Sequence, residues 1–304
     1  MRRRLRQVPG VGVLRLVLGA IVVVIAVAAS ISGYAASKQA TTQQSTFGDF
    51  DNPDRIEVSA WITRVDASTH AMSVTLLDIH PYGALSQNNT SVFAADASLL
   101  TNAVGNWKTA IKGGDSAPDA EQRIQIDGAF TNYPFDHYLT ALNIHVDNAD
   151  GTELPVALTV YNSDPFFQVS PSSAPSPDGG TVVNLDIRRS TPTVIFAVFV
   201  MVLMLGLAAG AAVAGYYVLH WKRGLIFPAC SMMAAILFAL IPLRNAVPGS
   251  PPIGSIIDFG SFFIAEAVIS ISLIAGILLG FRHQLAIERE DVPADTESAP
   301  AGRT

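Results

Sequence analysis

The residue with the clearest chemical potential is a single acid inside a long apolar stretch. Glu266 is the only charged residue between Phe259 and Phe281. It follows Asp258 by eight residues, about 12 Å along a helix. An ionised carboxylate in mid-bilayer costs on the order of 2.5–3.5 kcal/mol, so its side chain is expected to face protein or water. Two hypotheses follow: Glu266 acts in a proton or ligand relay, or it makes a structural hydrogen bond, for example to Arg244 or Ser270.

A second candidate is an aromatic turn that consists of Tyr133, Pro134, Phe135 and Asp136. Pro134 fixes its own φ and biases the preceding residue toward an extended conformation, which predicts a rigid loop. Its aromatic rings would either press onto helix ends and lipid headgroups or stabilise a corner of the domain. Asp136 would cap the turn or pair with Arg188 or Arg189, which lie just before an apolar run.

Other reactive residue types occur in patterns that do not favour catalysis or metal binding. His137 and His145 would lie roughly 26 Å apart on one strand, too far to share an ion. The acids near Asp147 do not form a calcium-binding loop. The single cysteine, Cys230, lies in an apolar run, so an intrachain disulfide is excluded. The sequence has no serine-hydrolase, zinc-protease or phosphate-loop signature. We therefore expect no catalytic residue, metal or cofactor.

Four apolar runs are long enough to cross a membrane as helices. About twenty helical residues cover the roughly 30 Å of bilayer hydrocarbon, where helices satisfy the backbone without water. Only 14% of the 304 residues are charged, against roughly a quarter in soluble domains. The predicted transmembrane helices are residues 16–37, 190–219, 224–243 and 259–281. The first could also be a cleaved signal peptide, but its length favours a retained anchor.

Between the first two runs, residues 38–189 are predicted to form one β domain. Ile56, Val58, Ala60 and Ile62 occupy every second position, the pattern of a half-buried strand. Similar short runs separated by turn sequences predict an antiparallel β-sandwich of seven or eight strands, and the fold class is α+β. The further expected strands are 71–79, 91–95, 122–130, 138–147, 154–161, 166–169 and 181–187. Residues 38–52 are expected to be a linker, 99–111 a short helix or long loop, and 170–177 an exposed loop.

The charges are distributed unevenly, and this predicts the topology. Residues 1–15 contain five arginines and no acid, whereas residues 38–193 contain 18 acids and 8 bases. The positive-inside rule places the basic segment 1–15 in the cytoplasm and the β domain outside, with 244–258 as an outer loop. Residues 282–304 are then a disordered cytoplasmic tail, and Arg244 is the one basic residue on the wrong side. The acidic domain argues against a nucleic-acid partner.

The layout resembles the domain-of-unknown-function family 4436 of actinobacterial membrane proteins. The resemblance is carried by the Tyr-Pro-Phe-Asp sequence at 133–136 and by residues 243–254 followed by 258–266. It is expected to extend from about Gly10 to Arg282. The resemblance implies no known activity, but it draws attention to Asp258 and Glu266, which fall inside the matching segment.

The chain is also distantly similar in architecture to pentameric ligand-gated ion channels. The similarity rests on residues 133–136 followed by a strand, and on Arg188 and Arg189 shortly before Pro192 and a span. In those channels such a loop couples a β-sandwich to the pore. This chain has three spans after the domain instead of four. The run 225–243 offers Ser231 but no ring of charged side chains of the kind that ion selectivity needs.

The expected function is that of a non-enzymatic binding, sensor, accessory or scaffold protein of the cell envelope. It would lie in the plasma membrane with both termini in the cytoplasm. Its expected partners are the lipid bilayer and either an envelope protein or further copies of the chain. The alternative is a transporter or ligand-gated-channel-like protein that uses Glu266.

Overall fold

The computed structural model describes residue 28 and residues 31–32, 44–175, 180–221 and 226–290. The predicted basic segment 1–15 lies outside these residues, as does almost all of the predicted helix 16–37. The chain divides into two compact units. The β unit comprises Met1–Val198 and Pro251–Ser255, and the helical unit comprises Phe199–Ser250 and Ile256–Thr304. We describe each unit by itself.

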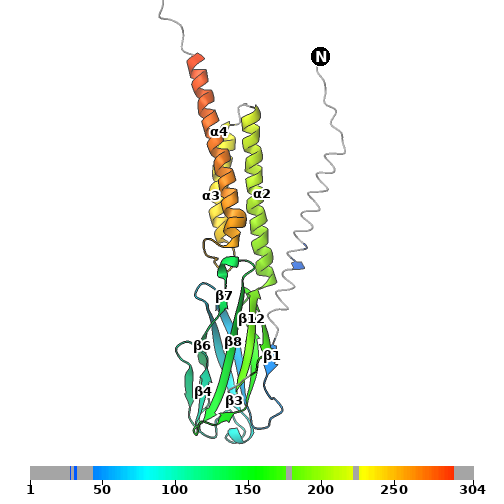
Figure 1. The fold of residues 1–304 in the computed structure, drawn as a ribbon, viewed down its shortest axis with the longest axis vertical. Coiled ribbons are helices and arrows are strands. Elements are labelled where there is room, and N and C mark those ends of the chain that lie inside the picture. The colour runs from blue at the N-terminus through cyan, green and yellow to red at the C-terminus, as the bar shows by residue number, and fades with distance from the viewer. Residues whose placement is uncertain (1–27, 29–30, 33–43, 176–179, 222–225, 291–304) are drawn as a thin grey trace, which may run out of the picture. The chain divides into compact units, whose positions relative to one another are not determined.

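The β unit contains two sheets (Figure 1). The first has the spatial order β1 (Gln44–Phe47), β10 (Val156–Asn162), β2 (Ile56–Asp66), β3 (Ala71–Pro81) and β6 (Ala120–Gln125). The second has the order β11 (Phe167–Ser173), β12 (Thr181–Arg189), β8 (His137–Asn148), β4 (Ala97–Thr101) and β5 (Lys108–Ile111). Two short strands, β7 (Asp127–Gly128) and β9 (Glu153–Leu154), also pair with β8.

Alternating side chains from both sheets form one hydrophobic core. The predicted inward set of β2, from Ile56 to Ile62, is buried as expected. In β12 every second residue is buried from Thr181 to Arg189. Because successive side chains of a strand point to opposite faces, this alternation carries an arginine to an inward position at the end of the strand.

The sandwich is not entirely antiparallel, in contrast to the prediction. Strands β2 and β10 are parallel, with Ile56 beside Val156 and Ile62 beside Asn162. The chain leaves β9 in the second sheet, crosses to the first, and starts β10 at the end where β2 also starts. Such a crossover connection is what a parallel pair requires.

Several local predictions within the β unit were wrong. Residues 99–111 form neither a helix nor a long loop, because β4 and β5 pair as a hairpin across them and bury Leu99 and Ile111. Residues 91–95 make only two isolated bridges. The expected linker 38–52 contains the edge strand β1, and the expected loop 170–177 begins inside β11. Pro171 is accommodated there because β11 is an edge strand, where a missing N–H breaks no ladder.

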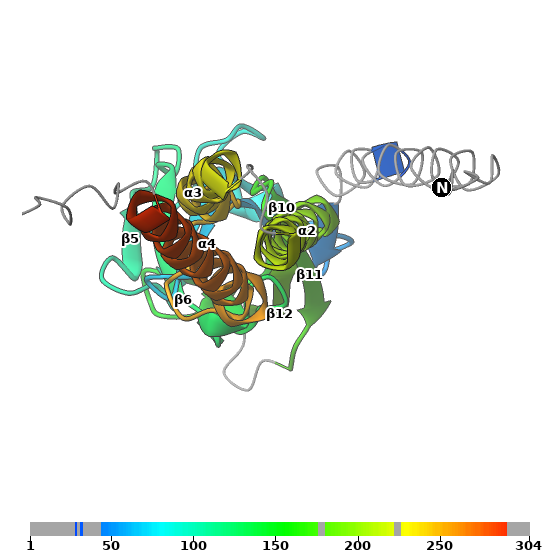
Figure 2. The ribbon, with the colours of Figure 1, turned by 90° about the horizontal axis from the view of Figure 1, so that it is seen from above.

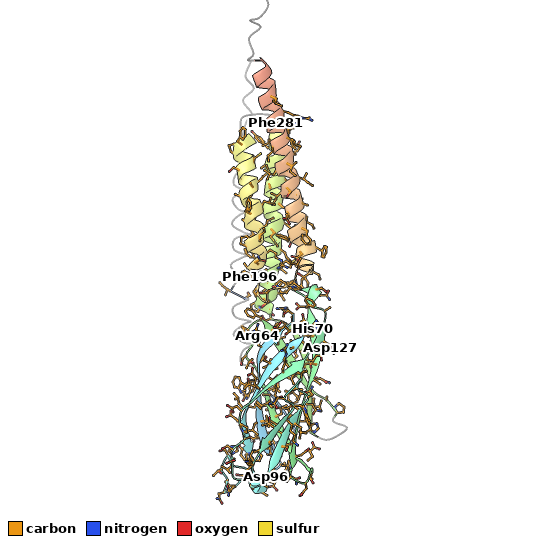
Figure 3. All side chains as sticks on the ribbon, turned by 90° about the vertical axis from the view of Figure 1, so that its left-hand side faces the viewer. Arg64, His70, Asp96, Asp127, Phe196 and Phe281 are labelled. Carbon is orange, nitrogen blue, oxygen red and sulfur yellow. The ribbon has the colours of Figure 1, made fainter. Side chains whose placement is uncertain are left out.

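The chain passes into its first described apolar helix at one end of the β unit. Figure 3 shows Asp96 at one end, and His70 and Asp127 at the other. Strand β12 finishes at the second end, and the chain passes through Ser190 into α2 (Thr191–Trp221). The Ser190 hydroxyl lies 2.9 Å from the Thr193 hydroxyl and donates to the Pro165 carbonyl, which anchors the start of this helix.

Among the described residues, three helices are long and apolar enough to cross a membrane, at Thr191–His220, Phe227–Asn245 and Asp258–Arg282. They correspond to α2, α3 (Ile226–Asn245) and a π-helical turn, η3 (Asp258–Phe262), that continues into α4 (Phe263–Glu290). Figure 2 views them nearly end-on. Helix α4 continues nine residues beyond the predicted span 259–281, so the first part of the expected disordered tail is helical. Residues 291–304 lie outside the described part of the chain.

Candidate functional site

The candidate site lies where β8 begins and β12 ends. These strands are antiparallel neighbours, and His137 is in register with Arg188. Alternation therefore divides the charged residues into two layers. Asp136 and Arg189 are buried, whereas His137 and Arg188 point outward. We call the first pair the inner layer, and His137, Asp186 and Arg188 the outer layer.

The inner layer is a buried ion pair. The Nε of Arg189 donates to both carboxylate oxygens of Asp136, at 3.0 and 2.9 Å, and its second terminal nitrogen lies 2.8 Å from Oδ2. The two side chains are 3% and 0% exposed. The Tyr138 hydroxyl donates a further hydrogen bond of 2.7 Å to Asp136. Burial, together with this carboxylate, raises the pKa of Tyr138, so the hydroxyl keeps its proton.

Two aromatic rings complete the surroundings of Arg189. Its guanidinium carbon lies 4.9 Å from the centre of the Tyr133 ring and 4.2 Å from that of Phe167. Within the described part of the chain, the other terminal nitrogen of Arg189 is buried without a hydrogen-bond acceptor. A ring face attracts a cation electrostatically, and the attraction is strongest where water is excluded. The rings therefore offset part of the cost of burying the charge.

The aromatic turn has one buried and one exposed aromatic side chain. A 3-10 helix, η2 (Phe130–Asn132), precedes a cis Tyr133–Pro134 peptide bond. The Phe135 amide donates to the Asn132 carbonyl and closes the turn. Tyr133 is fully buried, in agreement with the prediction of a stabilising corner, whereas Phe135 is 60% exposed. Tyr133 therefore lies in the interior of the β unit, and Phe135 lies on its surface.

The outer layer is an exposed cluster centred on Asp186. Arg188 donates to both of its oxygens at 3.0 Å, and His137 Nε2 lies 2.9 Å from Oδ1. The Arg188 hydrogen bond is the main cause that holds the pKa of Asp186 below its ordinary value; burial opposes it and His137 adds to it. Of the two arginines proposed as partners of Asp136, Arg189 is the one that pairs with it.

A cavity of about 380 Å³ opens beside these layers. Its wall consists of Pro134, Phe135, Asp136, His137, Arg188, Arg189 and Val194. Among the described residues no group of three His, Cys, Asp or Glu side chains is placed to hold a metal ion.

The helical unit contains a second buried ion pair. Arg244 at the end of α3 donates from Nε to Asp258 Oδ1 at 2.8 Å and from a terminal nitrogen to Oδ2 at 2.9 Å. Their side chains are 12% and 1% exposed. The prediction that Arg244 bonds Glu266 was therefore wrong. Glu266 lies half-buried in α4 and makes no hydrogen bond or ion pair among the described residues. Arg244 lies at the predicted outer side with its charge already neutralised.

Comparison with known families accounts for the chain in two parts. A family model described as a domain of unknown function, DUF4436, matches residues 46–188. This match supports the suspected DUF4436 family for residues 46–188. A second model, of the domain of unknown function DUF8686, matches residues 189–283. No curated protein matches the chain. The expected extent of the DUF4436 resemblance, from Gly10 to Arg282, was too long, because residues 243–266 fall in the DUF8686 region.

The boundary between the two matches falls inside the candidate site. Asp136 belongs to the DUF4436 domain, whereas Arg189 is the first residue of the DUF8686 region. The inner layer is thus a buried ion pair that joins the two family regions. Sequence reasoning assigned Phe167 only to a strand, and it placed Tyr138 among the aromatic residues of the turn without predicting its hydrogen bond to Asp136. An available signal was the alternation of β8, which places Tyr138 on the same face as Asp136.

Asp186 of the DUF4436 domain should make its stability depend on pH. A carboxyl whose pKa is lowered in the folded state stabilises the fold above its unfolded pKa, roughly 3.9. This contribution is lost as the pH falls through the lower, folded pKa. We expect Asp186→Asn to be slightly less stable than the wild type at pH 7, since exposed pairs contribute little. Urea midpoints measured across a pH series should converge in acid; a constant difference would contradict this.

Proposed function

We propose that the chain is a non-enzymatic, membrane-anchored binding protein of the cell envelope that acts as a sensor or accessory subunit. The DUF4436 domain would face outward and bind a ligand or an envelope partner, and both chain ends would lie in the cytoplasm. The single observation that carries the proposal is the inner layer. Asp136 and Arg189 connect the ligand-accessible domain to the start of α2 through a buried, bidentate contact.

The junction is suited to passing a change in the domain to the helix. Arg189 is the last residue of β12, and α2 begins two residues later. The Ser190 amide donates to the Phe166 carbonyl, and the Val194 amide donates to the Ser190 carbonyl. These hydrogen bonds connect the end of β12 to the first turn of α2. We therefore expect a displacement of β12 to move the start of α2 as well. Two packed arrangements of such a junction would provide a switch.

The acidic groups at the junction support a structural over a catalytic role. Asp136 is held by Arg189 and Tyr138, and Asp186 is held by Arg188 and His137. A general base needs a carboxylate or imidazole within reach of a substrate proton. Here each carboxylate already accepts charge-assisted hydrogen bonds from neighbouring side chains.

Replacement of Arg189 by lysine tests the coupling without removing the charge. Lysine cannot reproduce the bidentate fork or stack between two rings. We expect Arg189→Lys to reduce the protection of the backbone amides of residues 193–198 against hydrogen exchange by about tenfold, the loss of one charge-assisted hydrogen bond. The amides of the β8 and β12 cores should keep their protection. Full-length protein in lipid nanodiscs, followed by mass spectrometry, provides the measurement.

Arg123→Lys, on the exposed face of β6, is the matched control and should leave both regions unchanged. If Arg189→Lys folds and α2 retains its full protection, the inner layer does not couple the domain to the helix and the proposal fails.

A transporter or channel is the alternative function, and Glu266 is the observation that favours it. This carboxylate is half-buried within a candidate span. The three spans also bury only 11–28% of their apolar windows within the described chain, which leaves surface for further copies. Oligomer mass in detergent together with ion flux in liposomes separates the two functions. Flux that disappears in Glu266→Gln would favour the channel, and a monomer without flux would exclude it.

A further inference from the structure

The cavity beside the outer layer has the composition of a site for an amphiphile. Its lining combines the apolar side chains of Pro134, Phe135 and Val194 with the polar side chains of His137 and Arg188. Its volume of about 380 Å³ lies in the range of pockets for small ligands. The proposed coupling depends only on the buried inner layer. The cavity and the exposed Phe135 have no role in that coupling.

One lining residue of the cavity belongs to a candidate membrane span, and this indicates how deep the cavity would lie in a membrane. Val194 lies in the first turn of α2, and the candidate span Thr191–His220 has 30 residues. At 1.5 Å per residue this span is roughly 45 Å long, against about 30 Å of hydrocarbon, so it is long enough to extend beyond the hydrocarbon. The polar Thr191 and Thr193 favour the first turn as an end that lies in the headgroup region. Phe135 and Phe166, both exposed near the start of α2, have the character of side chains that lie at the interface.

Arg188 has a donor that the described part of the chain does not use. Its side chain is 67% exposed, and its Nε and one terminal nitrogen bond Asp186. Its other terminal nitrogen has no acceptor among the described residues. The ionisable groups around the cavity are the side chains of Arg188, Arg189 and His137 and the carboxylates of Asp136 and Asp186. Both carboxylates are engaged, so an added anion would meet free donors and not free acceptors.

We propose that this cavity binds the phosphate and glycerol portion of a phospholipid. Arg188 would donate to the phosphate, and Phe135 and Val194 would pack against the upper part of an acyl chain. A guanidinium fits a phosphate well because its planar donors match two phosphate oxygens. The inference rests on the membrane anchoring in the proposed function, but not on the coupling through Arg189.

Lipid titration of the delipidated full-length protein in detergent tests the site. The probe is short-chain phosphatidylglycerol, and native mass spectrometry counts the bound molecules. We expect Arg188→Gln to weaken the tightest binding by about tenfold, through loss of a charge-assisted hydrogen bond. Phe135→Ser should weaken it by several-fold, because the apolar wall loses its largest side chain. Arg123→Gln and Val104→Ser are matched controls on exposed positions elsewhere in the β unit and should change binding less than twofold.

Inorganic phosphate distinguishes a lipid from a free anion. The proposal requires that millimolar phosphate leave the lipid bound and that Phe135→Ser be impaired. If phosphate displaces the lipid and Phe135→Ser binds normally, the cavity takes a free phosphate and the lipid site is rejected. Equal binding by Arg188→Gln and Arg123→Gln also rejects it.

Carbonate extraction of native membranes provides the separate check on anchoring. Protein that stays in the carbonate-washed membrane but shows no Arg188-dependent lipid binding rejects the inference and leaves the proposed function intact. Protein that is released by carbonate rejects both.

Discussion

Asp136→Asn is expected to lower the free energy of unfolding of the β domain by about 3–5 kcal/mol, the usual cost of removing one partner of a buried ion pair. The substitution leaves the Arg189 guanidinium buried, 3% exposed, without a counter-charge. It also replaces the acceptor of the Tyr138 hydroxyl with a weaker one. The two aromatic rings attract the cation but supply no charge. Urea unfolding of the full-length protein in micelles, followed by tryptophan fluorescence, measures the change.

The outer layer provides the matched control for this prediction. Asp186→Asn removes a carboxylate from the same pair of strands, β8 and β12. The arginine partner of Asp186 is Arg188, the residue before Arg189. Because that pair is exposed, its loss should cost much less than the loss of the inner layer. The double variant Asp136→Asn with Arg189→Met removes both charges and should recover part of the stability, since no buried charge then lacks a partner. Equal losses in the two single Asn variants would show that burial does not control the energy.

The sequence predicted the inner layer in part. The motif at 133–136 and the two arginines were identified as candidates, but the choice between Arg188 and Arg189 was left open. The alternation of β12 decides it: Val183, Leu185 and Ile187 point inward, and the next inward position is Arg189. Because arginine is rarely buried without a partner, composition at this strand end argues against the inward position that the alternation indicates. The partner, Asp136, directly precedes β8, and a contact across 53 residues is not visible in a local pattern.

Local side-chain patterns could be interpreted from the sequence, whereas long-range pairings could not, and this difference explains which parts of the fold were predicted. Long alternating runs such as β2 and β8 were identified, since periodicity accumulates over eleven or twelve residues. The β4 and β5 strands have five and four residues, too few to separate a hairpin from a short helix. The parallel pairing of β2 with β10 depends on where the chain crosses between sheets, which side-chain patterns do not encode. In the helical unit, residue spacing placed Glu266 but could not reveal that the partner of Arg244 is Asp258.

Asp258→Asn should destabilise the α3–α4 hairpin by about 3–5 kcal/mol, for the same reason as the loss of Asp136. Asp258 is 1% exposed and holds Arg244 through two hydrogen bonds of 2.8 and 2.9 Å. It is also the first residue of the π-helical turn, so the ion pair holds the backbone where the π geometry begins. Far-UV circular dichroism of the full-length protein, titrated with sodium dodecyl sulfate in mixed micelles, reports the loss of helix.

Glu266→Gln is the control for Asp258→Asn, because it neutralises an acid in the helix that follows directly. Glu266 makes no hydrogen bond among the described residues, so its replacement should change stability by no more than about 0.5 kcal/mol. Arg244→Gln should cost about as much as Asp258→Asn, since each variant removes the same buried ion pair. If Glu266→Gln is the more damaging change, the hairpin depends on the acid in mid-span and not on the ion pair at its end. The helical unit would then owe its stability to a contact that Glu266 makes outside the described chain.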